Sequence, residues 1–118
     1  MFGDILGNAV NKVQGANAAV LMGFDGILVD MYTGEQKVDI ESMGMEFSVL
    51  LREVRNAAEL LNAGDANEMT IRTDRLLAVL RVVNQDYFIA MALAPSGNIG
   101  KARYTLRTLA PTILSEMV

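Results

Sequence analysis

The sequence contains no cysteine, no histidine and no tryptophan among its 118 residues, and it has only two prolines. Without cysteine there can be no disulfide framework and no thiolate metal site. Without histidine the chain lacks the commonest general acid–base and the commonest zinc ligand. No apolar run reaches the roughly 18 residues that a membrane-spanning helix needs. We therefore expect a cytoplasmic protein that has no resident cofactor, no metal and no membrane insertion.

Residues 1–13 do not follow the signal-peptide pattern of a basic start and an unbroken apolar stretch, because polar residues such as Asp4, Asn8 and Lys12 interrupt them. Their apolar residues instead recur at helical spacing. They predict an amphipathic helix over residues 2–13.

The balance of charge and hydrophobicity points away from nucleic acid and toward protein partners. The net charge is −4, with 10 basic and 14 acidic residues, so the chain offers no broad positive field to a phosphate backbone. Apolar residues make up 52% and charged residues 20% of the chain, which is more apolar than the roughly 45–50% of an average domain. A partner, such as a second copy, would cover the excess. A tightly packed monomer core is the alternative.

The order of apolar patterns predicts a single α+β domain over residues 1–118. One of its strands is almost continuously apolar and another is apolar throughout, so both faces of their sheet need cover by helices. The predicted architecture is a five-stranded, mostly antiparallel sheet with helices on both faces, in the order α-β-β-α-β-β-β-α. The predicted strands cover residues 18–24, 27–32, 68–73, 76–83 and 87–94, and the predicted helices cover residues 2–13, 39–62 and 99–117.

Local signals predict how these elements begin and end. Asp25-Gly26 favours a tight turn with positive φ angles between the first two strands. Asp39 is the expected N-cap of the long helix, and Gly64 the expected left-handed residue after it. Pro111 is expected to kink the last helix or to end its first half. The core-facing residues of the long helix are expected to be Ile40, Met43, Phe47, Leu50, Leu51, Val54, Ala58 and Leu61.

The opposite face of the long helix is the first candidate interaction site. Met45, Val49 and Leu60 lie there, beside Arg52 and Asn56. Methionine and arginine suit adaptable interfaces, so we expect this face to meet a partner. Isolated apolar residues on a helix surface are also common, and this remains the alternative.

The strand at residues 68–73 is the second candidate, because its alternation and short length are typical of a sheet edge. Met69 and Ile71 are expected on one face, and Thr70 and Arg72 on the other. Pairing with a second copy across a two-fold axis would satisfy the open backbone groups. Alternatively, the polar side chains simply keep the edge soluble.

Catalytic residues are not apparent, and we expect no enzyme. Asp30, inside an apolar strand, is expected to face solvent or to cap a backbone group. Glu35, Asp39 and Glu41 are neighbours, but no second set of ligands or bases converges with them by any visible pattern. Asn98 and the two residues before it open the last helix, and a helix cap explains them better than an anion site.

Three segments together resemble the roadblock (dynein light-chain roadblock type) family, whose fold is profilin-like. They are residues 13–15 (VQG), 19–29 (AVLMGFDGILV) and 95–103 (PSGNIGKAR). The resemblance covers the whole chain. It implies a sheet with the second helix on one face and the terminal helices on the other, and a homodimer formed through the third strands and second helices. It also implies a partner among small Ras-like GTPases, as for the bacterial MglB-type regulators, which reposition GTPase loops without inserting a catalytic arginine.

Two other functions stay open. Related sandwiches hold small ligands between sheet and helix, and Ala90, Ala92 and Ala94 could line such a cavity, although close helix packing explains them better. A protein scaffold unrelated to GTPases is the other alternative.

Overall fold

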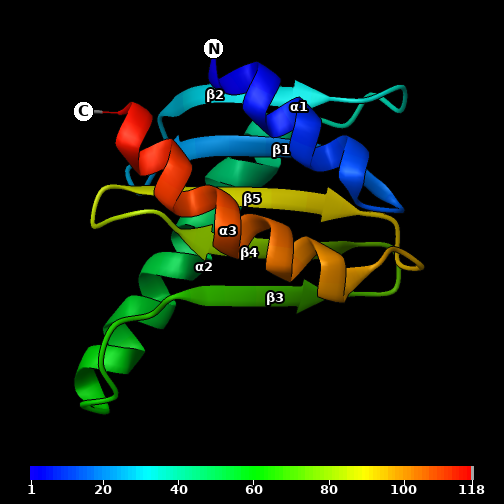
Figure 1. The fold of residues 1–118 in the computed structure, drawn as a ribbon. Helices are drawn as coiled ribbons and strands as arrows, with labels where there is room; N and C mark the ends of the chain where they lie inside the picture. Colours follow the sequence, from blue (N-terminus) through cyan, green and yellow to red (C-terminus); the bar gives the residue numbers. More distant parts are fainter. Residues whose placement is uncertain (118) are drawn as a thin grey trace.

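The computed structural model describes residues 1–117, which form one antiparallel sheet and three helices. The strands are ordered β2-β1-β5-β4-β3 across the sheet. This confirms the predicted fold class and the predicted order of elements (Figure 1). The elements are α1 (Phe2–Lys12), β1 (Ala16–Gly23), β2 (Leu28–Thr33), α2 (Ile40–Leu60), β3 (Glu68–Arg72), β4 (Leu77–Val82), β5 (Tyr87–Leu93) and α3 (Ile99–Glu116).

The helices cover the two faces of the sheet unequally, with α1 and α3 on one face and α2 on the other (Figure 1). Each face has its own core: Leu6, Leu106 and Ile113 belong to the first, and Phe47 and Leu51 to the second. The inner strands β1, β5 and β4 supply alternate residues to both cores, so they are almost entirely apolar, with Asn17 and Arg81 as the exceptions.

The connection between β1 and β2 differs from the predicted primed turn. Gly23 and Ile27 close it through a backbone hydrogen bond of 2.9 Å, and residues 24–26 form the loop. Only Gly26 has a positive φ, of 84°, while Asp25 keeps a negative one. The Asp25 carboxylate instead accepts a hydrogen bond from the Ile27 N–H. This is the three-residue loop in which a type I turn is followed by a left-handed residue.

Side-chain caps fix the starts of all three helices. Asp39 accepts a hydrogen bond from the Ser42 N–H, as predicted. Hydrogen bonding from the Ser42 side chain, together with this N–H bond, holds the Asp39 pKa below its usual value. Asn98 caps α3 through the Lys101 N–H. The cap of α1 comes from the sheet, because Asp30 on β2 accepts from the Gly3 N–H at 2.8 Å. Asp30 therefore has the capping role expected of it.

The far half of α2 corrects two predictions. Leu50 and Leu61 were expected in the core, but they are 45% and 77% exposed. Leu61 follows the last turns of α2, which extend past β3, where no strand lies over them (Figure 1). Leu50 lies at the middle of the helix, to one side of the buried stripe that contains Phe47 and Leu51. The predicted cap is also wrong. The left-handed residue that ends α2 is Asn62, with φ 52°, and Gly64 lies farther along the linker.

The last helix runs through Pro111 without ending. It is continuous from Ile99 to Glu116, and Pro111 lies inside it on the exposed side. The core-facing residues Leu106, Ala110 and Ile113 are buried on both sides of the proline, so packing holds the helix together there. The expected termination is therefore wrong.

Candidate protein-interaction surface

The outward side of α2 presents a set of apolar side chains to solvent. Met45 is 49%, Val49 45% and Leu60 87% exposed, as predicted, and Leu50 and Leu61 add to them. We call these five residues the α2 surface. A patch of this kind on one element commonly marks a protein-interaction site.

Arg52 and Arg55 tie α2 to the loops at one end of the sheet. The Arg52 guanidinium donates to the Phe24 carbonyl oxygen, although Arg52 is exposed. Arg55 donates to the carbonyl oxygens of Gln85 and Asn84 at 2.9 and 3.2 Å, and its Cζ lies 3.4 Å from the centre of the Phe24 ring. Both arginines of α2 therefore position this helix. The other polar residue predicted on this face, Asn56, is exposed.

The predicted edge strand β3 does form one border of the sheet, since it pairs only with β4 in the described residues. Met69 and Ile71 lie partly buried on the α2 face, and Thr70 and Arg72 are exposed on the α3 face. The alternation is therefore as predicted. Arg72 also donates to the Pro95 carbonyl oxygen at 3.3 Å. The outer backbone groups of β3 are open for pairing.

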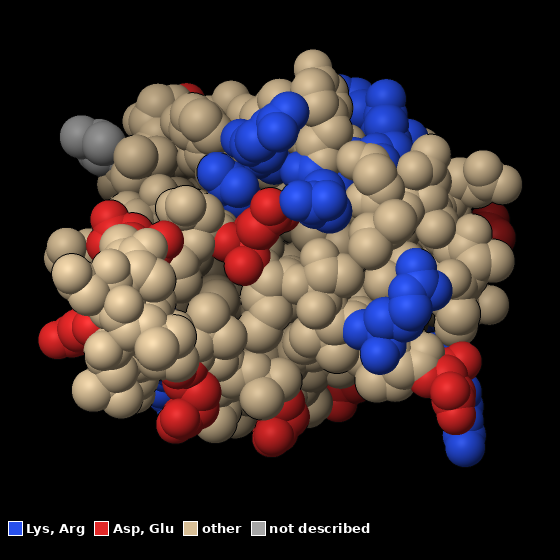
Figure 2. Space-filling view, turned by 90° about the horizontal axis from the view of Figure 1, so that it is seen from below, with Lys and Arg blue, Asp and Glu red and all other residues tan. Residues whose placement is uncertain are grey.

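The β3 edge and the end of α2 lie at the same end of the molecule (Figure 1). Seen from that end, uncharged surface extends across the part of the view below the centre, with blue side chains above and to the right of it and red ones along its lower border (Figure 2). The last turns of α2, which include Leu60, therefore share a region with β3. Met45 lies farther away, beside Gly44, in the half of α2 that packs against β1. Whether this region is an interface stays a prediction.

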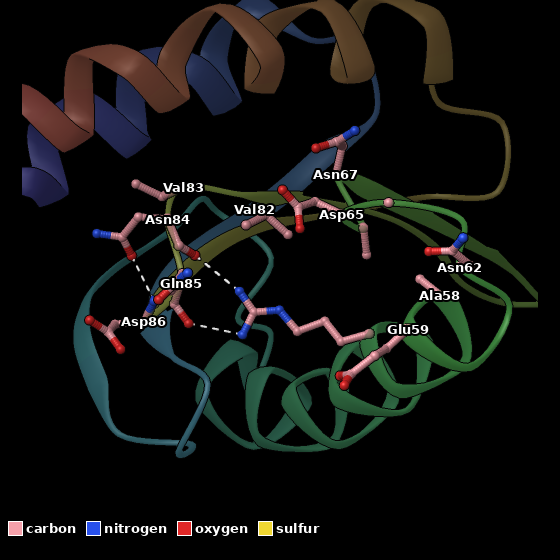
Figure 3. Close-up of a pocket in the computed structure, with 13 residues that line it drawn as sticks. Ala58, Glu59, Asn62, Asp65, Asn67, Val82, Val83, Asn84, Gln85 and Asp86 are labelled. Carbon is pink, nitrogen blue, oxygen red and sulfur yellow. Dashed lines mark hydrogen bonds between the residues drawn. The ribbon is translucent and has the colours of Figure 1, made fainter.

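A groove of about 770 Å³ runs beside the end of α2. Ala58 and Glu59 of α2 line one side, and Asn84, Gln85 and Asp86 of the β4–β5 turn lie opposite (Figure 3). The Arg55 side chain crosses between the two sides, and its guanidinium group donates hydrogen bonds to backbone carbonyl oxygens of the turn. The lining is mainly polar. Ala90 and Ala92, expected as possible cavity residues, lie buried in the core beneath α2, where they allow close packing.

No cluster of three or more acidic side chains that could hold a metal ion occurs among residues 1–117. Glu35 and Glu41 are both exposed, and Asp39 serves as the helix cap. Within the same residues, no helix is both long and apolar enough to cross a membrane.

The structure also exposes apolar residues for which no sequence pattern predicted an interface. Ile27, Val29 and Met31, in and just before the other edge strand, are 66%, 39% and 42% exposed.

The exposure of Leu61 could have been predicted from the length of α2, since 21 helical residues span about 31 Å. Five strands about 4.8 Å apart span only about 19 Å. A helix that crosses such a sheet must extend beyond it.

Comparison with solved structures connects this architecture to known proteins. MglC from Myxococcus xanthus is 41% identical to the chain over 98% of each protein, with a TM-score of 0.71. The chain belongs to the roadblock family. A Roadblock/LC7 domain from Streptomyces avermitilis is 17% identical, with a TM-score of 0.85 over 98% of this chain and 96% of that one.

An MglB with a tetrameric arrangement is 12% identical, with a TM-score of 0.85 over 95% of this chain and 84% of that one. At 12% and 17% identity these two likenesses show the fold alone, whereas the likeness to MglC extends to the sequence. No protein-family model matches the chain, and a search of curated proteins finds no match. The resemblance to roadblock domains that the three sequence segments indicated is confirmed.

Proposed function

We propose that this chain is a non-enzymatic homodimeric adaptor that binds and regulates a small Ras-like GTPase in the cytoplasm. The observation that carries the proposal is the position of the last turns of α2, with the exposed Leu60 and Leu61 at their end, next to the open edge of β3. Apolar side chains and unpaired backbone groups both need a partner, and a second copy of the chain would satisfy both.

The geometry of such a dimer follows from the edge. Two antiparallel β3 strands related by a two-fold axis would join the sheets into one, and this axis would be perpendicular to the sheet. Both α2 helices would then lie on the same face. Because α2 extends past β3, its last turns would reach across the boundary to the partner, and Leu60 and Leu61 would become covered.

The GTPase part of the proposal rests on the family. The chain has the same fold as MglB and is 41% identical in sequence to MglC. The resemblance to MglB-type regulators implies a GTPase partner. The tethers on Arg52 and Arg55 support regulation by positioning, because both guanidinium groups of α2 are already bonded to backbone carbonyls. Neither is free to enter a GTPase site and stabilise the transferring phosphate.

Light scattering after size exclusion tests the dimer. We expect wild-type chain to elute with twice its 12.8 kDa mass. A variant with Val49→Asp and Leu60→Asp should elute as a folded monomer, because both side chains are exposed in the isolated chain. Leu114→Asp is the matched control, since Leu114 is 38% exposed on α3, away from the α2 surface. A double variant that remains dimeric, or a wild type that is monomeric, would refute the arrangement.

Binding of a Ras-like GTPase encoded near this chain tests the second part. The GTPase is loaded with GDP or with a non-hydrolysable GTP analogue and passed over immobilised chain. We expect retention of one nucleotide state in preference to the other. Equal retention of both states would favour a scaffold over a regulator, and no retention of either would contradict GTPase binding while leaving the dimer intact.

A further inference from the structure

Three arginines surround one glutamate on the α3 side of the sheet, outside the α2 surface. Arg103 on α3 reaches Glu68 on β3 through two hydrogen bonds, of 3.1 and 2.8 Å. This is the one ion pair within residues 1–117. Arg81 lies directly opposite Glu68 across the β3–β4 ladder, and Arg107 lies one turn beyond Arg103.

The group carries a positive excess, because one carboxylate faces three guanidinium groups. The pKa of Glu68 is lowered first by its hydrogen bonds to Arg103, and the charges of Arg103, Arg81 and Arg107 lower it further. The charges of Arg81 and Arg107 are not paired with another carboxylate in the described chain. In a chain with net charge −4, such a concentration of one sign stands apart. Figure 2 shows blue side chains grouped around a red one in the upper half of this view.

The surface beside these arginines contains a shallow depression that is lined in part by an aromatic side chain. A depression of about 180 Å³ is lined by residues of α3 together with Glu68. Tyr104 is 55% exposed within it, and the Arg107 Cζ lies 5.5 Å from the Tyr104 ring centre. Tyrosine and arginine are enriched among the few residues that contribute most of the binding energy at protein interfaces.

We propose that this surface, formed by Arg81, Arg103, Tyr104 and Arg107 and called here the arginine patch, binds an acidic segment of another protein. Carboxylates of that segment pair with Arg81 and Arg107, and an apolar side chain of the segment rests on the Tyr104 ring. The concave shape and the carboxylate of Glu68 within the patch favour a peptide over a flat anionic membrane. The patch lies within one chain, so the inference does not depend on dimer formation. In the proposed dimer both patches would lie on the same face, beside the joined β3 strands.

Fluorescence anisotropy with a defined probe tests the arginine patch. The probe is a fluorescein-labelled peptide of glutamate and serine with leucine at every third position, and the control probe has glutamine in place of glutamate. We expect only the acidic probe to bind, with an affinity that falls as salt is added. Arg81→Gln with Arg107→Gln should weaken binding about ten-fold or more, since two charge-assisted hydrogen-bond partners are lost.

The matched control is Lys12→Gln with Lys37→Gln, which lowers the net charge equally but lies at exposed positions away from the patch. This control should bind the probe as wild type does. Equal weakening by both double variants would reduce the effect to net charge and overturn the proposal. So would binding of the glutamine probe, or absence of binding to the acidic probe. Association with phosphatidylserine-containing vesicles, but not with the acidic probe, would replace the peptide by a membrane. Light scattering on each variant shows whether the dimer is intact, so that weaker binding of the probe is not confused with loss of the dimer.

Discussion

Asn62 has a backbone conformation that most side chains avoid. Its φ of 52° lets the Asn62 and Ala63 N–H groups bond to the carbonyl oxygens of Glu59 and Ala58, at 3.0 and 2.8 Å. These two bonds are the Schellman pattern that satisfies the free carbonyls at a helix end. Asparagine tolerates this conformation better than most residues, and glycine adopts it without a steric penalty.

Replacing Asn62 by glycine should therefore stabilise the chain. We expect Asn62→Gly to raise the free energy of unfolding by about 0.5 kcal/mol, and Asn62→Ala to lower it by about 1 kcal/mol, because alanine carries the full penalty of the left-handed conformation. Urea unfolding at one fixed protein concentration measures both. The same sign for the two variants would mean that α2 does not end in this way.

The ion pair of Glu68 makes a pH-dependent contribution to stability. Arg103 holds the pKa of Glu68 below its unfolded value, so the ion pair stabilises the native state above the unfolded pKa of about 4.3. That stabilisation is lost as the pH falls through the lower, native pKa. Because the pair lies at the surface, its size is at most about 1 kcal/mol.

Glu68→Gln should therefore destabilise the chain by up to about 1 kcal/mol at neutral pH, and the difference from wild type should vanish in acid. Urea unfolding at a series of pH values gives the comparison. Glu35→Gln removes the same charge from an exposed loop and should lack this dependence. A Glu68→Gln effect that is constant over the whole pH range would show that lost packing, and not the ion pair, is responsible.

At the scale of elements, the docking of α1 depends on a close approach between helix and sheet. Gly7 is buried against β2, and a Cβ at this position would lie 2.8 Å from Cδ1 of the Tyr32 ring. Two effects of Gly7→Ala oppose each other. Helix propensity favours alanine by about 1 kcal/mol, whereas overpacking against a ring costs about 1–3 kcal/mol.

The steric cost should prevail, so Gly7→Ala is expected to lower the melting temperature. Gly100→Ala is the matched control, because Gly100 is an exposed glycine at the start of α3 whose Cβ would meet only Asn98 Oδ1, at 3.8 Å. This variant should gain up to about 1 kcal/mol from propensity alone. Combining Gly7→Ala with Tyr32→Leu should recover part of the loss. Additive effects of the two changes would show that Gly7 and Tyr32 are not coupled.

Most elements could be predicted because their signals are local. The apolar runs of β1, β4 and β5 and the caps Asp39 and Asn98 depend on neighbouring residues, and the structure places them as expected. The errors concern longer-range effects. Leu61 has helical spacing with the core residues, but whether it is buried depends on the width of the sheet that α2 crosses. Likewise, packing on both sides of Pro111 keeps α3 continuous against the local cost of a proline.

The candidate sites divide in the same way. The exposure of Met45, Val49 and Leu60 followed from their position opposite the core stripe of one helix. The arginine patch could not be anticipated, because Glu68, Arg81 and Arg103 come from three elements that only the folded topology brings together.

For the whole molecule, the proposed dimer links stability to concentration. When a folded dimer is in equilibrium with unfolded chains, mass action raises the melting temperature as protein concentration rises. A ten-fold increase in concentration is worth about 1.4 kcal/mol per dimer, or about 0.7 kcal/mol per chain. With an unfolding entropy of about 2.1 cal/mol/K per residue, a chain of 118 residues should gain about 3 °C.

Calorimetry over a hundred-fold range of concentration should therefore move the wild-type melting temperature upward by about 6 °C. The variant with Val49→Asp and Leu60→Asp should melt at a lower temperature that does not change with concentration, because only the association is removed. Leu114→Asp should keep the wild-type slope. A wild-type melting temperature that stays constant over the whole range would mean that the chain unfolds as a monomer. The exposed side chains of α2 would then not hold two copies together.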